Sequence, residues 1–222
     1  MTRDPAVAYT AADGTGELRS PYWRSQFDNV QDAVTSFLLD YDDANQRASA
    51  LDERILGQAS SISPNYADLV SLAARQAMGG TELTIRGSGN QWNTSDVKMF
   101  MKDMGTSGRV SPVEGLYSSF PSFLYLNASY GGYLLEPILE YGNSSSWPNP
   151  YAPRDLGLNY PNATGNSATH SQGVEQSGNM LIMALAHAKA SGDGSLLSRY
   201  YGLLKNWADY LVDNSSPLPE GQ

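Results

Sequence analysis

The sequence predicts a mainly α-helical protein made of paired helices, of the α/α toroid or solenoid type, with one small β-hairpin inserted. Three observations predict this class. Apolar residues recur at steps of three and four over several long segments, Gly and Pro residues separate these segments, and one stretch alternates polar with apolar residues. With 222 residues, 41% of them hydrophobic, the chain can bury a sizeable core.

The first helical region begins near Asp28. Its apolar residues from Val30 to Ile55 return at steps of three and four, which predicts one long amphipathic helix or two in series. A further helix is predicted from Pro64, because proline suits the first helical turn, to the Gly79-Gly80 pair.

The small hairpin is predicted next. Residues 81–86 alternate polar with apolar side chains, and residues 97–101 form a short apolar segment. Gly87 and Gly89 lie between the two segments. Shorter helices are then predicted over residues 118–127 and 130–141, each containing a proline that limits its regularity.

The segment 143–172 is rich in Asn, Ser, Pro and Gly, which favours turns, and it is longer than an ordinary connection. Long ordered loops are usually functional.

Residues 174–190 are apolar on nearly every side and predict a helix buried all round. After Gly194, the spacing of Leu196, Leu203 and Leu211 predicts an amphipathic partner helix.

These elements divide the chain into three parts. Residues 1–27 are expected to form an extended N-terminal segment, residues 28–214 a helical domain, and residues 215–222 a linker-like tail rich in Pro and Ser. The opening residues do not form a signal peptide, so a secreted protein would need a signal upstream in a precursor, where further flanking domains would also lie.

Composition excludes several partners. The formal net charge is -9 and the basic residues are scattered singly, so nucleic acid is not an expected partner. No apolar run approaches the roughly 20 residues that span a bilayer. The chain has no cysteine, which rules out disulfides, thiolate metal sites and cysteine nucleophiles.

Five Asn-x-Ser/Thr sequons predict a secreted glycoprotein, although an Asn- and Ser-rich chain also forms such motifs by chance. The predicted glycosylation sites are Asn93, Asn127, Asn143, Asn162 and Asn214.

Several distinctive motifs are spread over most of the chain. They include Arg3-Asp4-Pro5-Ala6-Val7, Leu135-Glu136-Pro137-Ile138-Leu139-Glu140-Tyr141, Tyr151-Ala152-Pro153-Arg154-Asp155-Leu156-Gly157, Tyr160-Pro161-Asn162-Ala163-Thr164-Gly165 and Val174-Glu175-Gln176-Ser177-Gly178-Asn179-Met180. In the order and spacing of these motifs the chain resembles the fungal secreted glutaminase A family. The chain departs from the family pattern at Arg154, where histidine is usual, and at Gln172-Gly173, where Met-Pro is usual.

The resemblance implies that the chain is the family's central domain and that the complete protein hydrolyses L-glutamine outside the cell to glutamate and ammonia. An isolated fragment would then be expected to lack activity if flanking domains complete the site. The alternative is a carbohydrate-binding or carbohydrate-active helical module, because helical toroids with paired carboxylates also suit glycoside hydrolysis. The expected partner is thus a small-molecule substrate or a glycan. A third possibility is a structural domain.

Asp155 and Glu175 are the predicted catalytic pair. They flank the long loop and the start of the apolar helix, where helix-end amides and a low dielectric shift carboxyl pKa values. The competing interpretation is structural: Asp155 caps a turn, and Glu175 stabilises the first turn of its helix. If the two carboxyl groups share a cleft, an activated water would attack the amide.

Arg154, His170 and Asn179 are the predicted substrate-binding residues. Ser177 is a possible nucleophile, but no catalytic-triad or Ser-x-x-Lys signature surrounds it. His187 lies in an apolar helix and is expected to be a packed core residue. No metal site and no cofactor are predicted, since no calcium-loop pattern accompanies the acidic residues near Asp40.

Overall fold

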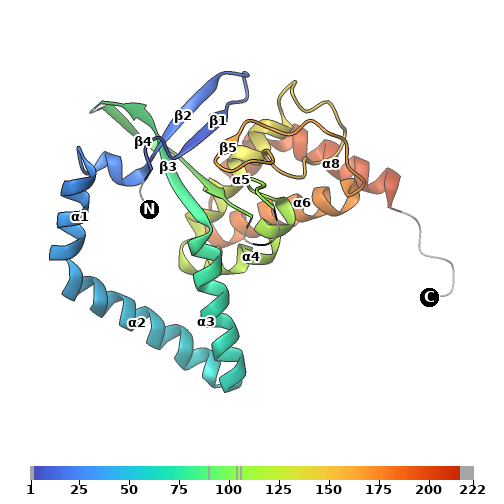
Figure 1. Cartoon of the computed structure of the whole chain (residues 1–222). Helices are drawn as coiled ribbons and strands as arrows, with labels where there is room; N and C mark the ends of the chain where they lie inside the picture. The colour runs from blue at the N-terminus through green and yellow to red at the C-terminus, as the bar shows by residue number, and fades with distance from the viewer. Residues whose placement is uncertain (1–2, 90, 104, 106, 216–222) are drawn as a thin grey trace.

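The computed structural model describes residues 3–215, with the exception of residues 90, 104 and 106. This part of the chain folds into eight α-helices and one five-stranded sheet (Figure 1). The mainly α class is therefore confirmed, whereas closure of the helices into a toroid stays a prediction. The predicted linker at 215–222 lies outside the described residues, apart from Ser215.

The sheet has the strand order β4-β3-β2-β1-β5. Consecutive strands β1 and β2 pair antiparallel, as do β3 and β4, while the short β5 joins β1 in parallel. The strands are β1 (Val7–Thr10), β2 (Gly16–Pro21), β3 (Thr81–Ser88), β4 (Gln91–Met101) and β5 (Asn162–Ala163).

The predicted β-hairpin at 81–101 is confirmed as β3 and β4, but it is not an isolated insertion. It forms one half of a larger sheet, because β2 pairs with β3 through Ser20 and Ile85. The N-terminal segment expected to be merely extended supplies β1 and β2. These strands contain only four and six residues, and they form a hairpin whose turn carries Asp13-Gly14, a local signal that the prediction missed. Their pairing with β5 and β3 is distant in the sequence.

The first helical region consists of two helices in series, α1 (Val30–Leu39) and α2 (Tyr41–Ser60). The next helix, α3 (Pro64–Gly79), has the predicted boundaries. Figure 1 shows α2 and α3 contacting each other near the turn that joins them, at the end of α3 that lies away from the sheet. The apolar side chains of α1 do not find a core: Phe37 is 69% exposed and Leu39 is 83% exposed.

Helices α4 (Val113–Leu126) and α5 (Ala128–Gly142) replace the two shorter helices predicted over 118–127 and 130–141. Both contain their proline inside the helix, and α4 begins five residues earlier than expected, directly after Pro112. Asn127 separates the two helices with an extended backbone, and its side chain caps α5 by accepting a hydrogen bond from the Ser129 N–H.

The expectation that the helix at 174–190 is buried on all sides is wrong. Helix α6 (Gly173–Ser191) buries one face, which carries Met180, Met183 and His187, while Ile182 and Leu185 are each more than half exposed. The predicted partner helix is present but divided at Tyr200 into α7 (Ser195–Arg199) and α8 (Tyr201–Asn214).

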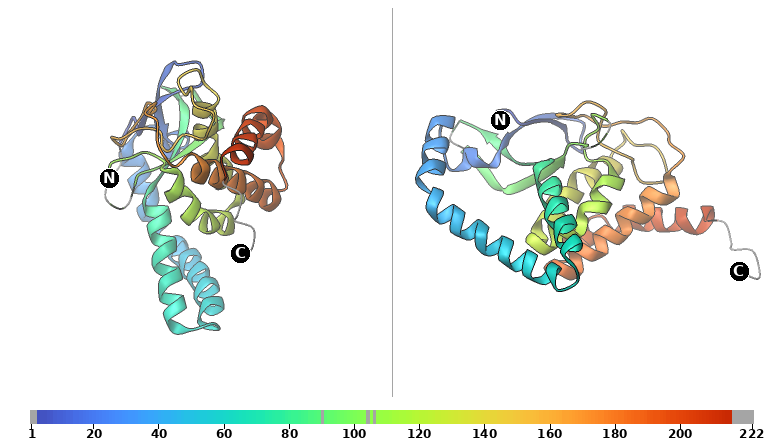
Figure 2. Two further views of the ribbon diagram at one scale, coloured as in Figure 1. Left: turned by 90° about the vertical axis from the view of Figure 1, so that its right-hand side faces the viewer. Right: turned by 60° about the horizontal axis from the view of Figure 1, so that its bottom comes forward.

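The core lies between the sheet and the helices α4, α5, α6 and α8, which contact one another in pairs (Figure 2). Its largest fully buried apolar side chains come from both layers: Tyr9 and Phe100 from the sheet, and Phe123, Ile138 and Trp207 from the helices. None of the helices described in the structure is long and apolar enough to cross a membrane.

Candidate functional site

The long segment 143–172 connects α5 to α6 and is ordered by backbone hydrogen bonds to the segment that precedes α4. Leu156 donates to the Val110 carbonyl at 2.9 Å, Val110 donates to the Gly157 carbonyl at 2.8 Å, and Val113 donates to the Arg154 carbonyl at 3.0 Å. These bonds fix Asp155 against the residues 109–114.

Two glycines allow the loop to close on itself. Gly157 has φ +138°, and a Cβ there would lie 2.7 Å from the Asn162 carbonyl oxygen. Gly165 has φ +89°, and its Cβ would lie 2.5 Å from the ring of Tyr141. Only glycine fits such positions without strain, so the loop approaches its neighbours more closely than side chains would permit.

Asp155 lies at the bottom of this loop with only 1% of its surface exposed. Its Oδ1 atom accepts hydrogen bonds from the Gly157 N–H at 3.0 Å and from the Asn166 amide at 3.2 Å. Its Oδ2 atom is buried and has no hydrogen-bond partner among the described residues. Burial raises the pKa of the Asp155 carboxyl, and its hydrogen bonds to Gly157 and Asn166 oppose this effect only in part.

The nearest charge to Asp155 Oδ2 is the guanidinium of Arg109, whose Nη1 lies 3.9 Å away and is also buried without a hydrogen-bond partner among the described residues. The Nη2 of Arg109 binds Asp103 and Glu114, and the Gln176 amide donates to the second oxygen of Glu114 at 3.2 Å. We refer to Asp155, Arg109, Glu114 and Gln176 as the Asp155 cluster.

The cluster holds two groups with open bonding capacity. The desolvated carboxylate of Asp155 and the guanidinium of Arg109 face each other, and each has one buried atom without a partner among the described residues. The second carboxylate, the 35% exposed Glu114, holds the other terminal nitrogen of Arg109. A buried group that lacks a partner costs free energy, and such sites are candidates for ligand contact.

Of the predicted residues, only Asp155 belongs to this cluster. Glu175 lies in the first turn of α6 with an exposed side chain, and no described residue forms an ion pair or hydrogen bond with it. The buried polar residue that α6 contributes is its neighbour Gln176, which is 0% exposed. The pairing of Asp155 with Glu175 therefore stays a prediction without a contact to support it.

The other predicted residues surround the cluster without joining it. Arg154 is half-buried and fixes the loop through its carbonyl group, and Asn179 lies 3.4 Å from the Gln176 side-chain oxygen. Ser177 is fully buried and accepts a hydrogen bond from the Ala152 N–H at 3.0 Å, so its hydroxyl anchors the loop.

His170 packs in an aromatic group at the end of the same loop. Its ring stacks on Trp147 at 5.8 Å and contacts Tyr151 edge-on at 4.9 Å, and its Nε2 lies 3.1 Å from the Ala152 carbonyl. Burial lowers the pKa of His170, which favours the neutral imidazole. His187 is buried as expected, with Nδ1 3.0 Å from the Ala128 carbonyl.

Arg109, Glu114 and Gln176 were not predicted from the sequence. Glu114 carried a local signal, because it follows Pro112 in the first turn of a helix, where acidic residues are favoured. Arg109 carried none, since its proximity to Asp155 depends on how the loop 143–172 folds back.

The sequence matches two family models in succession. Residues 63–222 match the Glutaminase A six helical-hairpin domain, and residues 1–58 match a domain of unknown function, DUF5127. The chain belongs to the glutaminase A family. This confirms the resemblance carried by the motifs, and the boundary between the two models lies in α2 and the turn that follows it.

Two curated relatives agree with this assignment. The chain is 32% identical over 218 residues to Glutaminase A of Aspergillus oryzae, and 35% identical over 189 residues to a probable glutaminase of Arthroderma benhamiae. The first alignment covers 97% of this chain and the second 83%. The chain spans only 31% and 21% of the lengths of these relatives. No solved structure matches the chain.

Proposed function

We propose that the chain is part of an amidohydrolase that releases ammonia from L-glutamine, and that the Asp155 cluster is its hydrolytic centre. The observation that carries the proposal is the unpartnered, buried Asp155 Oδ2 facing the unpartnered Arg109 Nη1 at 3.9 Å. Family membership supplies the reaction class, since the relatives named above are called glutaminases.

The proposed reaction is attack by an activated water. Asp155 removes a proton from the water as its oxygen bonds to the amide carbon, and the guanidinium of Arg109 stabilises the negative charge that develops on the amide oxygen. The C–N bond then breaks, and the proton held by Asp155 passes to the leaving nitrogen. Ammonia and the side-chain carboxylic acid of glutamate result. The acid then gives its proton to the ammonia, so a carboxylate and an ammonium ion leave and atoms and charge balance.

Burial suits Asp155 to this role. A carboxylate that is desolvated and lacks a donor on one oxygen is a stronger base than a solvated one, which the raised pKa of this group expresses. Glu114 completes the arrangement by holding Arg109 in place, and Gln176 in turn orients Glu114.

The test is ammonia release from L-glutamine by the complete protein and by this chain alone. We expect Asp155→Asn to lower the rate by about 10²- to 10⁴-fold, the usual contribution of a general base. Asp209→Asn is the matched control, because Asp209 is an exposed carboxylate paired with Lys205 on α8. Full activity of the Asp155→Asn variant would overturn the assignment of the base.

A second comparison tests whether Glu114 or Glu175 is the carboxylate that acts together with Asp155. If Glu114 positions Arg109, Glu114→Gln lowers the rate strongly while Glu175→Gln leaves it nearly unchanged. The opposite result would support the pair Asp155 and Glu175. A glycan-binding screen on the same chain tests the alternative of a carbohydrate-binding module.

We also propose that the protein acts outside the cell. The support is that all five sequon asparagines are exposed, so each is accessible to the glycosylation machinery.

A further inference from the structure

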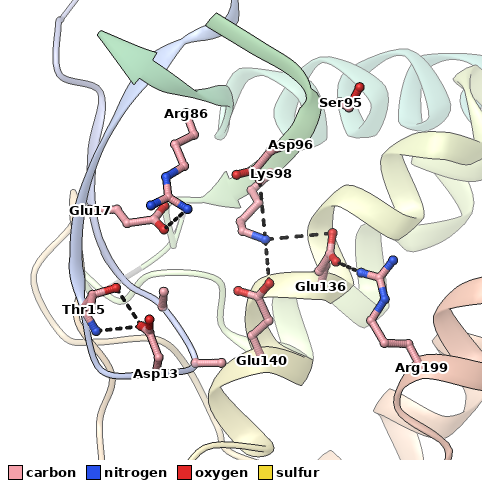
Figure 3. A pocket seen from close by; sticks show the side chains of 12 residues that line it. Asp13, Thr15, Glu17, Arg86, Ser95, Asp96, Lys98, Glu136, Glu140 and Arg199 are labelled. Carbon is pink, nitrogen blue, oxygen red and sulfur yellow. Dashed lines mark hydrogen bonds and ion pairs between the residues drawn. The ribbon is translucent and has the colours of Figure 1, made fainter.

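A polar pocket lies at the junction of the sheet and the helices, and none of its lining residues belongs to the Asp155 cluster. Its volume is about 480 Å³. Side chains reach it from the β1–β2 turn, from β3 and β4, and from α5 and α7 (Figure 3). Ten of its twelve lining residues are polar or charged and the other two are alanines, so an apolar ligand would find no complementary wall.

The floor of the pocket is a desolvated ion pair. Lys98 on β4 and Glu140 on α5 are 2.7 Å apart, and their side chains are only 8% and 18% exposed. The hydroxyl of Tyr9 donates to the other oxygen of Glu140. Lys98 also lies 3.8 Å from Asp96 and 3.9 Å from Glu136, so the cation is already balanced by three carboxylates.

The charged side chains at the rim of the pocket have fewer ion-pair partners than Lys98 has. Arg86 on β3 has one ion pair, to Glu17 at 3.2 Å, and its side chain is 61% exposed. A guanidinium has five donors in a fork that matches a carboxylate, so most of this capacity is available. Arg199 on α7 is similar, with Glu136 as its ion-pair partner and a side chain that is 59% exposed.

The opposite charge is supplied at the β1–β2 turn by Asp13. Both hydrogen bonds that it accepts, from the Thr15 N–H and hydroxyl, go to Oδ1, and no described residue donates to Oδ2. These bonds to Thr15 lower the pKa of Asp13, so the group is a carboxylate at neutral pH. Figure 3 shows Asp13 on the hairpin turn, Arg86 on a strand of the sheet, and the side chains of Lys98 and Glu140 to one side of both.

We infer that this pocket binds a zwitterionic α-amino acid by its head group, with the carboxylate on Arg86 and the ammonium group on Asp13. Opposed charges with open bonding capacity fit a ligand that carries both an anionic and a cationic group. None of the described lining residues is aromatic, which disfavours a sugar that binds by stacking.

The inference does not rest on the proposed hydrolysis, because binding is measured without turnover. The experiment is isothermal titration calorimetry of this chain with L-glutamine, and with two analogues that each lack one charge. N-acetyl-L-glutamine has no ammonium group, and L-glutaminamide has no α-carboxylate. We expect glutamine to bind this pocket separately from any substrate bound at the Asp155 cluster, and each analogue to bind the pocket at least about tenfold more weakly, the size of one charge-assisted hydrogen bond.

Variants assign the site. Arg86→Gln and Asp13→Asn should each weaken glutamine binding about tenfold. Arg47→Gln should not, and it is a matched control because Arg47 is 64% exposed and has one ion pair, to Asp40. Circular dichroism verifies that each variant is folded.

Three outcomes would overturn the inference. One is the absence of binding at up to about 10 mM glutamine, well above usual substrate affinities. Another is equal weakening by Arg86→Gln and Arg47→Gln. The third is loss of binding in Asp155→Asn with none in Arg86→Gln, which would move the amino acid to the Asp155 cluster. If the chain binds glutamine at the pocket but releases no ammonia, this inference stands although the proposed hydrolysis by the chain fails.

Discussion

Asp155 Oδ2 and Arg109 Nη1 face each other at 3.9 Å, and neither has a hydrogen-bond partner among the described residues. The distance is too long for a hydrogen bond and short enough for strong electrostatic attraction in a buried setting. A charged pair that is close but not hydrogen-bonded leaves both groups able to contact a third one. The buried Arg19 of the sheet differs in this respect, because its guanidinium donates hydrogen bonds to Asp96.

The raised pKa of Asp155 predicts a specific pH dependence of stability. The folded protein holds the Asp155 proton more tightly than the unfolded chain, whose pKa is about 3.8. Protonated Asp155 therefore increases the free energy of unfolding. This contribution is fully present below the pKa of the unfolded chain and is lost as the pH rises through the pKa of the folded protein. Wild type should lose stability relative to Asp155→Asn as the pH is raised from about 3 to 7.

Melting temperatures of the two proteins over this range test the prediction. Asp209→Asn serves as the control, since that carboxylate is 58% exposed on α8. A wild type that gains stability relative to Asp155→Asn with rising pH would mean that Arg109 outweighs burial and holds the pKa below its ordinary value.

The elements that the sequence predicts well are those with local signals. Helix α3 begins where Pro64 occupies the first turn and Ser63 caps it, accepting a hydrogen bond from the Tyr66 N–H at 3.1 Å. Strand β1 pairs with β2 across the Asp13-Gly14 turn, a local hairpin signal that the prediction missed, whereas its pairing with β5, far along the chain, leaves no local signal. The exposed face of α6 has a related cause, because composition does not reveal which neighbours cover a helix.

In the candidate site, too, the residue with a local sequence signal was predicted and the residue without one was not. Asp155 is predictable because it stands in a distinctive motif within a long polar loop. Its partner Arg109 lies in a different segment, and only the hydrogen bonds between Val110 and the loop bring the two together. Glu175 has the local features of a catalytic acid, yet the buried polar position on α6 belongs to Gln176.

A glycine substitution tests whether the loop conformation is strained. Gly157→Ala should lower the free energy of unfolding by roughly 1–3 kcal/mol, because the new Cβ would collide with the Asn162 carbonyl at a positive φ. Gly178→Ala is the matched control within α6, where an added Cβ would meet nothing within 4 Å and helix propensity should add about 0.5–1 kcal/mol. Urea unfolding of both variants gives the comparison, and equal effects would refute the close approach.

The contrast between the core and helix α1 gives a further prediction. Ile138 is fully buried on α5, so Ile138→Ala should cost about 2–5 kcal/mol. Leu39 is 83% exposed, so Leu39→Ala should change the stability of this chain by less than about 0.5 kcal/mol. A large loss for Leu39→Ala in urea unfolding would show that the apolar face of α1 is covered in solution.

At Asn127, the effect of losing the glycan can be measured separately from the effect of losing a helix cap. Asn127 is exposed, and its Oδ1 caps α5 by accepting from the Ser129 N–H at 3.0 Å. A glycan attaches through the side-chain nitrogen, so the cap and the sugar can coexist. Ser129→Ala removes the sequon but keeps the backbone donor, whereas Asn127→Gln removes both the sequon and the capping geometry.

In protein secreted from a eukaryotic host, both variants should therefore lose the mass of one glycan, as intact mass spectrometry measures. Asn127→Gln should additionally lower the stability by about 1 kcal/mol, the usual cost of losing an N-cap, while Ser129→Ala stays close to the wild type. Comparing the two after enzymatic deglycosylation removes any contribution of the other sequons. A wild-type mass equal to that of the bare polypeptide would contradict the expected modification, and equal stabilities of the two variants would show that Asn127 does not cap α5.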